Sequence, residues 1–146
     1  MKPKELLHLD NQLCFPLYAA SRMMTKLYQP LLEKLDITYP QYLILLVLWQ
    51  NDELAVNIIG NKLMLETNTL TPLLKRMEAK GIIKRTRSKS DERRVIIKLT
   101  NKGNSLKQLA LCIPTNLLKG ASEHFPLKNI YRLQTELKTF LEVLAK

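Results

Sequence analysis

The order of segments between residues 67 and 103 restricts the fold of this chain more than any other feature. The first segment has apolar side chains at helical spacing on one face, at Leu70, Leu73, Leu74 and Met77. Its opposite face is polar and cationic, and Gly81 stands where a helix C-terminal cap is expected. Residues 82–87 and 94–99 then predict two strands joined by a charged tip.

A second short helix is expected just before this stretch, at residues 56–63, followed by a turn at residues 65–68. The helix after the turn is expected to take its N-terminal cap from one of three polar residues, Thr67, Asn68 or Thr69. Two short helices joined by a tight turn are typical of a helix-turn-helix, and an added hairpin forms a wing. Residues 38–100 or so therefore predict a winged helix-turn-helix core.

Apolar helices are predicted before this motif. Residues 38–41 match a capping box that opens an apolar helix at residues 41–50, and such a helix belongs in a core. The first long helix is expected at about residues 13–35. Pro16 is tolerable there only in the first turn, and Pro30 should end or kink the helix near Tyr28.

Two further helices are predicted after the wing. Thr100 should cap a helix that runs to about Lys119 with a kink at Pro114, and residues 127–144 carry an apolar stripe. We expect the terminal helices, at about residues 10–35 and 101–146, to pack against a second copy of the chain. The expected fold is thus a single domain over residues 1–146, mainly α with a small β-hairpin.

The charge of the chain favours a polyanionic partner. The formal net charge is +10, and between Lys75 and Lys98 ten cations face three acids. Nucleic acid is the first candidate and an anionic membrane surface the second. The longest apolar run, residues 42–49, is too short to span a bilayer, and the first residues do not read as a signal peptide. We therefore expect a cytoplasmic protein without a membrane partner, in which both cysteines are thiols.

A charge run is often only a solvated face, but here the cations concentrate on a short helix and a hairpin tip. The helix would enter a major groove of double-stranded DNA, and Arg93 would enter the adjacent minor groove. Asp91 would orient Arg93 or Arg94 through a charge-assisted bond. The residues expected to contact DNA are Thr67, Asn68, Thr69, Thr71, Lys75, Arg76, Arg87, Lys89, Arg93 and Arg94.

The wing resembles that of a known family. Asp91-x-Arg93 followed by Leu99-Thr100-x-x-Gly103 is similar to the DxR…LTxxG signature of the MarR family of bacterial transcription regulators. The resemblance covers nearly the whole chain. It implies a homodimer whose two winged helices bind a near-palindromic operator. We expect neither an enzyme nor a cofactor.

A narrower resemblance is to OhrR, the organic-hydroperoxide-sensing repressors of that family. It rests on Leu13-Cys14-Phe15, Tyr18, Tyr28, residues 37–42 (ITYPQY) and residues 70–76 (LTPLLKR). It implies that Cys14 senses the peroxide, that Tyr28 and Tyr39 hydrogen-bond it across the dimer, and that Tyr18 belongs to the same pocket. Glu66-Thr67-Asn68 departs from the Asp-Ser-Gly that often stands in the family before the recognition helix, so operator preference could differ.

The residues around Cys14 fit this chemistry, although a lone cysteine is more often a packed apolar residue. If Pro16 marks the first turn of a helix, Cys14 lies near a helix N-terminus, which favours a thiolate. Attack on a peroxide would give a sulfenic acid, which a low-molecular-weight thiol could capture. The apolar neighbours of Cys14 would favour organic hydroperoxides over hydrogen peroxide.

Several alternatives stay open. Cys112 could act as a resolving thiol or be a packed helix residue. The signal could be a small aromatic ligand or a general thiol oxidant, and the remote alternatives are a thiol peroxidase and a non-specific nucleic-acid-binding protein. No metal site is expected, because His8 and His124 are isolated from other ligand residues.

Overall fold

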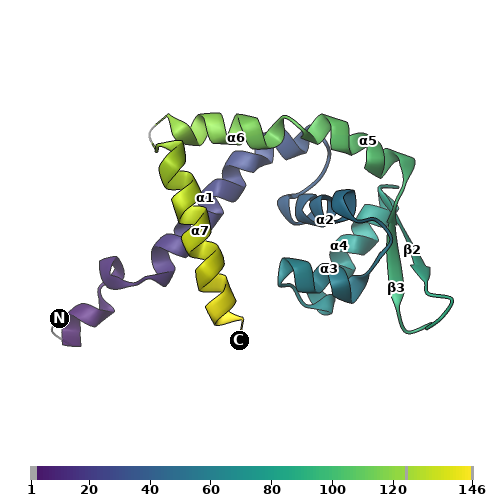
Figure 1. Cartoon of the computed structure of the whole chain (residues 1–146), viewed down its shortest axis with the longest axis horizontal. Helices are drawn as coiled ribbons and strands as arrows, with labels where there is room; N and C mark the ends of the chain where they lie inside the picture. Colours follow the sequence, from purple (N-terminus) through teal and green to yellow (C-terminus); the bar gives the residue numbers. More distant parts are fainter. Residues whose placement is uncertain (1–2, 124, 146) are drawn as a thin grey trace. The chain divides into compact units, whose positions relative to one another are not determined.

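The computed structural model describes residues 3–123 and 125–145, and the chain divides into two compact units, Met1–Ala110 and Leu111–Lys146. The first unit contains five α-helices and a small sheet, and the second contains two α-helices (Figure 1). Two short 3-10 segments, Pro3–Leu7 and Leu9–Asn11, precede the first α-helix. His124, which entered the expectation of no metal site, lies outside the described residues.

The centre of the first unit is the apolar helix α2, Tyr39–Gln50. The Thr38 N–H donates to Gln41 Oε1 at 3.0 Å, and Pro40 lies in the first turn, so the predicted capping signal is confirmed. Ile44, Leu45 and Leu48 are buried to 1% exposure or less. A helix that is apolar on nearly every side thus becomes the core of the unit, as its sequence predicts.

The predicted helix-turn-helix is present as α3, Val56–Leu63, and α4, Thr67–Ala79. Leu70, Leu74 and Met77 are completely buried, which confirms the apolar face of α4. The expected cap is wrong: Glu66 is the N-cap residue, without a side-chain cap bond. Because the Thr69 and Leu70 N–H groups both bond the Glu66 carbonyl oxygen, helical geometry begins before the three polar candidates, which instead form the first turn.

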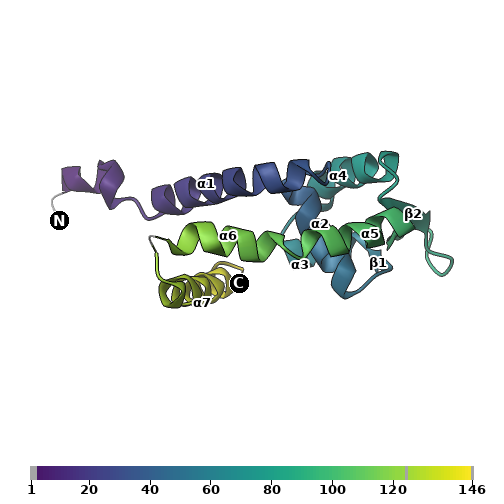
Figure 2. The ribbon, with the colours of Figure 1, turned by 90° about the horizontal axis from the view of Figure 1, so that it is seen from above.

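The wing follows directly from the end of α4. Gly81 has a φ of +69°, and the Ile82 N–H donates to the Met77 carbonyl at 3.0 Å, which is the predicted glycine cap. Strands β2, Ile83–Arg87, and β3, Val95–Leu99, pair antiparallel as predicted. A short strand that the sequence did not predict, β1, Leu54–Ala55, pairs with the other side of β3. The loop between β2 and β3 projects beyond the helices of its own unit (Figure 2).

Helix α1, Cys14–Glu33, contains Pro16 and Pro30. Pro16 lies in the first turn, where the N–H that it lacks has no partner in any helix. Pro30 does not end the helix near Tyr28, since α1 continues to Glu33. One missing backbone bond near the C-terminal end does not stop a helix whose Leu32 is buried.

The predicted helix at residues 101–119 is wrong as a single element. The chain forms α5, Asn101–Ala110, and α6, Ile113–Ser122, with a turn between them. Thr100 caps α5 as expected, because its Oγ1 accepts the Gly103 N–H at 3.1 Å. Pro114 occupies the first turn of α6, so this proline starts a new helix instead of kinking an existing one.

The second unit contains α6 and the last helix, α7, Leu127–Leu144, whose bounds agree with the prediction. Ile113 and Leu117 of α6 are buried. Helix α7 has no buried residue, and its large apolar side chains are exposed at Leu127, Tyr131, Leu133, Phe140, Leu141, Val143 and Leu144. None of the helices in the described parts of the chain combines the length and apolar character needed to cross a bilayer.

Candidate nucleic-acid interface and cysteine site

The outer face of α4 presents the polar residues that the sequence singled out. Thr67, Asn68 and Thr69 form its exposed first turn, and Lys75 and Arg76 are exposed further along. The Thr71 hydroxyl donates to the Thr67 carbonyl at 2.8 Å. Its proton is therefore committed, and the Thr71 oxygen remains available as an acceptor for a donor group on a ligand.

The wing tip is a hydrogen-bonded turn that carries four exposed cations, Arg87, Lys89, Arg93 and Arg94. Asp91 Oδ1 accepts the backbone N–H of Arg93 at 3.1 Å, and the Arg94 N–H donates to the Asp91 carbonyl at 2.9 Å. The sequence led us to expect a bond from Asp91 to an arginine side chain. The bond found here goes to the main chain, so Asp91 shapes the turn from which both arginines project.

A groove of about 390 Å³ lies between α4 and the wing. Thr67 and Thr71 line it from α4, and Arg93 and Arg94 line it from the hairpin. The fold thus brings residues that are far apart in the sequence to one groove, and the charged residues that line this groove are all cationic. Lys75, Arg76, Arg87 and Lys89 are not among the residues that line this groove.

Sequence reasoning missed Arg85, which also lines this groove. Its side chain donates from Nε to Glu78 Oε2 at 3.0 Å, and its backbone N–H donates to Glu78 Oε1 at 3.2 Å. Strand alternation could have found it, because Arg85 shares a strand face with the buried Ile83. The cations that the sequence predicts as DNA contacts lie on the helix face and around the hairpin tip, and Arg85 belongs to neither group.

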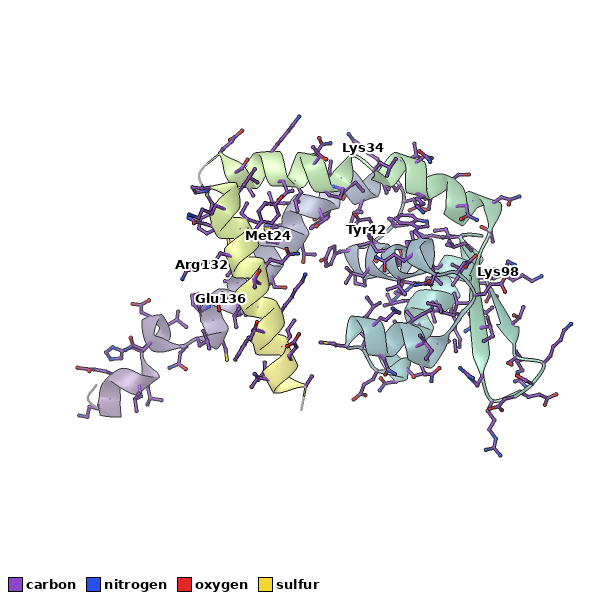
Figure 3. The ribbon with its side chains drawn as sticks, in the orientation of Figure 1. Met24, Lys34, Tyr42, Lys98, Arg132 and Glu136 are labelled. Atoms are coloured by element: carbon purple, nitrogen blue, oxygen red, sulfur yellow. The ribbon has the colours of Figure 1, made fainter. Side chains whose placement is uncertain are left out.

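A tyrosine cluster joins α1 to α2. The ring centroids of Tyr28 and Tyr39 are 4.8 Å apart, and those of Tyr28 and Tyr42 are 5.9 Å apart. Tyr42, labelled on α2 in Figure 3, was not predicted as a site residue, although it lies one helical turn after Tyr39. Burial, together with the neighbouring Tyr39 and Tyr42, raises the pKa of Tyr28 to about 12. Burial also raises the pKa of Tyr39 and of Tyr42.

Cys14 is the first residue of α1, and its thiol is free and exposed. Tyr18 lies one turn further on and is 62% exposed, and the Arg22 guanidinium carbon lies 5.0 Å from the centre of the Tyr18 ring. Cys14 and Tyr28 are fourteen residues apart in the same helix, which is roughly 21 Å along its axis. Within one copy of the chain, the thiol and the tyrosine cluster are therefore separate.

Three other features bear on the chemistry. Cys112 is exposed and is the N-cap residue of α6. Among residues 3–123 and 125–145, no three histidine, cysteine or acidic residues lie close enough to hold a metal ion. A cavity of about 410 Å³ lies between α1 and the start of α2, and its lining includes Arg22, Lys26 and Tyr39.

A helix-turn-helix with a basic hairpin, and a cationic groove between the two, defines a winged-helix DNA-binding protein. Comparison with known proteins gives the same class, because residues 26–109 match the family model "Transcriptional regulator SarA/Rot". The chain belongs to the MarR/SarA family of DNA-binding transcriptional regulators, which are not enzymes. The predicted family and the winged-helix fold are therefore confirmed.

Individual proteins of the family are similar to this chain over nearly its whole length. The organic hydroperoxide resistance transcriptional regulator of Bacillus subtilis is 53% identical over 93% of this chain and 91% of its own length. AbfR of Staphylococcus epidermidis, solved reduced and bound to DNA, is 38% identical over all of both chains with a TM-score of 0.83. A disulfide form of AbfR is 39% identical over 95% of this chain and 96% of that chain, with a TM-score of 0.67.

Proposed function

We propose that this regulator is a homodimeric repressor that releases a near-palindromic operator when an organic hydroperoxide oxidises Cys14. The observation that carries the proposal is the free, exposed thiol at the first residue of α1. A helix N-terminus carries partial positive charge, which favours the thiolate that attacks a peroxide. The similarity to a hydroperoxide resistance regulator, and the existence of reduced and disulfide forms of AbfR, support the same reading.

On DNA, α4 would occupy a major groove and the wing an adjacent minor groove. The exposed first turn of α4 supplies Thr67, Asn68 and Thr69 for base edges or phosphates, and Thr71 adds an acceptor. Lys75 and Arg76 would hold flanking phosphates. At the wing, Arg93 would enter the minor groove, and the remaining exposed cations there, Arg87, Lys89 and Arg94, would contact the backbone.

Two observations support a dimer. The exposed apolar side chains of α7, and of α1 at Met23, Met24 and Leu27, offer apolar surface of the kind that a second copy of the chain could cover. The separation of Cys14 from Tyr28 along α1 agrees with what the resemblance to OhrR implies, namely that Tyr28 and Tyr39 reach the cysteine of a second copy. With its pKa near 12, Tyr28 keeps its proton at neutral pH, so its hydroxyl can donate to the sulfur of the partner's cysteine.

The proposed switch consumes one hydroperoxide for each cysteine. The thiolate sulfur attacks one peroxide oxygen, the O–O bond breaks, and the alkoxide takes up a proton and leaves as an alcohol. Sulfur is thereby oxidised to a sulfenic acid. A second thiol, either a low-molecular-weight one or Cys112 of another copy, then forms a disulfide and releases water.

Release of DNA would follow from the loss of the phenol–thiolate bonds. A sulfenic acid or a disulfide adduct is larger than a thiolate and presents different hydrogen-bonding groups. Helix α1 contacts α2, and α2 packs against α3 and α4. A shift of α1 would therefore change the spacing of the two recognition helices, which must match the half-sites of the operator.

The test compares wild type with Cys14→Ser in DNA binding. A duplex from the region upstream of its own gene would be titrated with protein that is reduced, treated with cumene hydroperoxide or treated with hydrogen peroxide. Wild type should lose the duplex after cumene hydroperoxide and Cys14→Ser should retain it. Equal release of both proteins would exclude the cysteine switch, and equal rates with the two oxidants would remove the preference for organic hydroperoxides.

The fate of the oxidised sulfur is settled by a separate measurement. Non-reducing electrophoresis and intact mass after peroxide treatment distinguish a covalent dimer from an adduct with a small thiol. A dimer band that disappears in Cys112→Ser would assign the resolving role to Cys112. An adduct of the added thiol in both proteins would assign that role to the small thiol.

A second candidate keeps the fold and changes the signal to a small aromatic ligand. The cavity between α1 and α2 favours it, because Arg22 and Lys26 could pair with an acidic group and Tyr39 could contact a ring. Salicylate would serve as the probe. Release of DNA by salicylate from Cys14→Ser, abolished by a further Lys26→Met change, would support this candidate.

A further inference from the structure

The groove between α4 and the wing has a required occupant when DNA is bound. An element in a major groove and an element in the adjacent minor groove have one sugar–phosphate strand between them. In the proposed complex those elements are α4 and the hairpin, so a backbone strand would cross the groove of about 390 Å³ that both of them line. The three charged residues that line the groove are all arginines, Arg85, Arg93 and Arg94.

Arg85 differs from the other two in how the fold holds it. It lies in β2, opposite the completely buried Ile97 of β3, and on the same strand face as the buried Ile83. Its side chain is only 26% exposed, whereas Arg93 and Arg94 project from the turn into solvent. The guanidinium of Arg85 therefore approaches the groove from the protein side.

Glu78, near the end of α4, fixes the direction of that guanidinium. One carboxylate oxygen accepts the Arg85 backbone N–H at 3.2 Å, and the other accepts Nε–H at 3.0 Å. Because Nε is used, the plane of the guanidinium is set while both terminal nitrogens keep their protons for a ligand. The same carboxylate joins α4 to β2, so it also links the recognition helix to the wing.

We propose that Arg85 binds a phosphate of the operator strand that crosses this groove, and that Glu78 is its positioning residue. The proposal rests on the DNA-binding part of the proposed function and not on the oxidation of Cys14. All measurements therefore use reduced, full-length protein. The probe is a short duplex that the wild-type protein enriches from a random-sequence library, so the natural operator need not be known.

The first comparison is Arg85→Gln against Lys84→Gln. Both changes remove one positive charge from β2, but Lys84 is exposed on the opposite strand face. Arg85→Gln should weaken binding about ten-fold, as expected for loss of a charge-assisted bond. It should also make the fall of log affinity with log salt concentration shallower, by about 0.9 in slope for each bound subunit. Lys84→Gln should change affinity less than about two-fold.

The second comparison distinguishes a positioning role of Glu78 from an effect of net charge, because the two explanations predict opposite changes in DNA affinity. Glu78→Gln and Glu92→Gln each remove one negative charge, so each raises the formal net charge of +10 by one. Non-specific attraction therefore predicts tighter DNA binding by both variants. Glu92 is exposed at the wing tip. If Glu78 positions Arg85, Glu78→Gln should instead bind about three-fold more weakly than wild type, because a neutral amide holds the guanidinium less firmly.

Chemical unfolding shows whether each variant is folded. If Arg85→Gln does not fold, Arg85→Lys tests the same side chain. The lysine keeps the charge but lacks the rigid planar donors with which the guanidinium can hold Glu78 and a phosphate in a fixed geometry, so we expect weaker binding with a nearly unchanged salt slope. Two results would overturn the proposal. One is an Arg85 variant that binds as well as Lys84→Gln, and the other is Glu78→Gln binding as tightly as Glu92→Gln.

Discussion

The indole N–H of Trp49 donates to the carbonyl oxygen of Gly103 at 3.0 Å, which ties the end of α2 to the first turn of α5. Gly103 also lies against the chain just after α4, because a Cβ atom built on it would fall 2.3 Å from the Ile82 carbonyl oxygen. The glycine of the LTxxG signature is therefore a packing requirement at the base of the wing.

We predict that Gly103→Ala destabilises the fold by at least about 2 kcal/mol, because the added methyl group overlaps a backbone oxygen that cannot rotate away. Gly120→Ala is the matched control. It adds the same methyl group to α6 with no atom within 4 Å, and it should stabilise by about 0.5–1 kcal/mol. Urea unfolding followed by circular dichroism measures both. Equal effects would contradict the packing explanation.

Trp49→Phe tests the hydrogen bond itself. A smaller aromatic ring remains at the position, but the donor is lost and the Gly103 carbonyl loses this bond. We expect the free energy of unfolding to fall by about 1 kcal/mol. Circular dichroism is the right probe, since the chain has one tryptophan and the variant has none. An unchanged midpoint would mean that water replaces the indole without cost.

Met64 ends α3 with a φ of +54°, a conformation that costs most residues about 1–2 kcal/mol and glycine very little. Its side chain is 61% exposed, so little burial is lost on removal. Met64→Gly should therefore raise the unfolding free energy by about 1 kcal/mol. Met64→Ala retains Cβ and should give no such gain. If alanine stabilises as much as glycine, the backbone is not the cause.

The raised pKa of Tyr28 predicts a loss of stability at high pH. The folded-state pKa of about 12 lies above the ordinary value of 10.0, so the folded chain holds a proton that the unfolded chain has already released. The stabilisation is complete below pH 10 and is lost as the pH rises from 10 toward 12. Tyr28→Phe should reduce the decline in that window and remove the latest step of the tyrosinate absorbance titration. Unfolding at neutral pH is the control.

At the wing tip, Asp91→Ala and Asp91→Asn should separate the turn from the charge. Asparagine keeps an oxygen that can accept the Arg93 N–H, whereas alanine does not. Asp91→Ala should weaken DNA binding by about five-fold, which corresponds to loss of about one hydrogen bond that orders the turn. Asp91→Asn should bind at least as tightly as wild type. The reverse order would assign the effect of Asp91 to its charge.

Much of the fold was predictable because its signals are local. Periodicity located the buried faces of α2 and α4, and Gly81 marked the end of the recognition helix. The errors arose where a local signal is ambiguous. Pro114 fits a kink and a helix start equally well, and two residues of β1 form a strand only because β3 lies beside them.

The candidate site was predictable to a similar degree. Motif spacing located the cations of the helix and the wing tip, and these prove to lie on exposed surfaces. Arg85 and Tyr42 were missed because their importance depends on partners across the fold, Glu78 for one and Tyr28 for the other. The roles assigned to Cys14, Tyr28 and Tyr39 are predictions, because Cys14 and Tyr28 stand fourteen residues apart in α1 of one copy.

The bond between Glu78 and the Arg85 backbone also bears on how the free protein avoids aggregation. Strand β2 forms one edge of the sheet, and an exposed edge can pair with the same edge of another molecule. The carboxylate occupies one outward N–H of that edge, and Lys84 and Arg87 place repelling charges along it. The hairpin can therefore project freely without joining hairpins of neighbouring molecules into a continuous sheet.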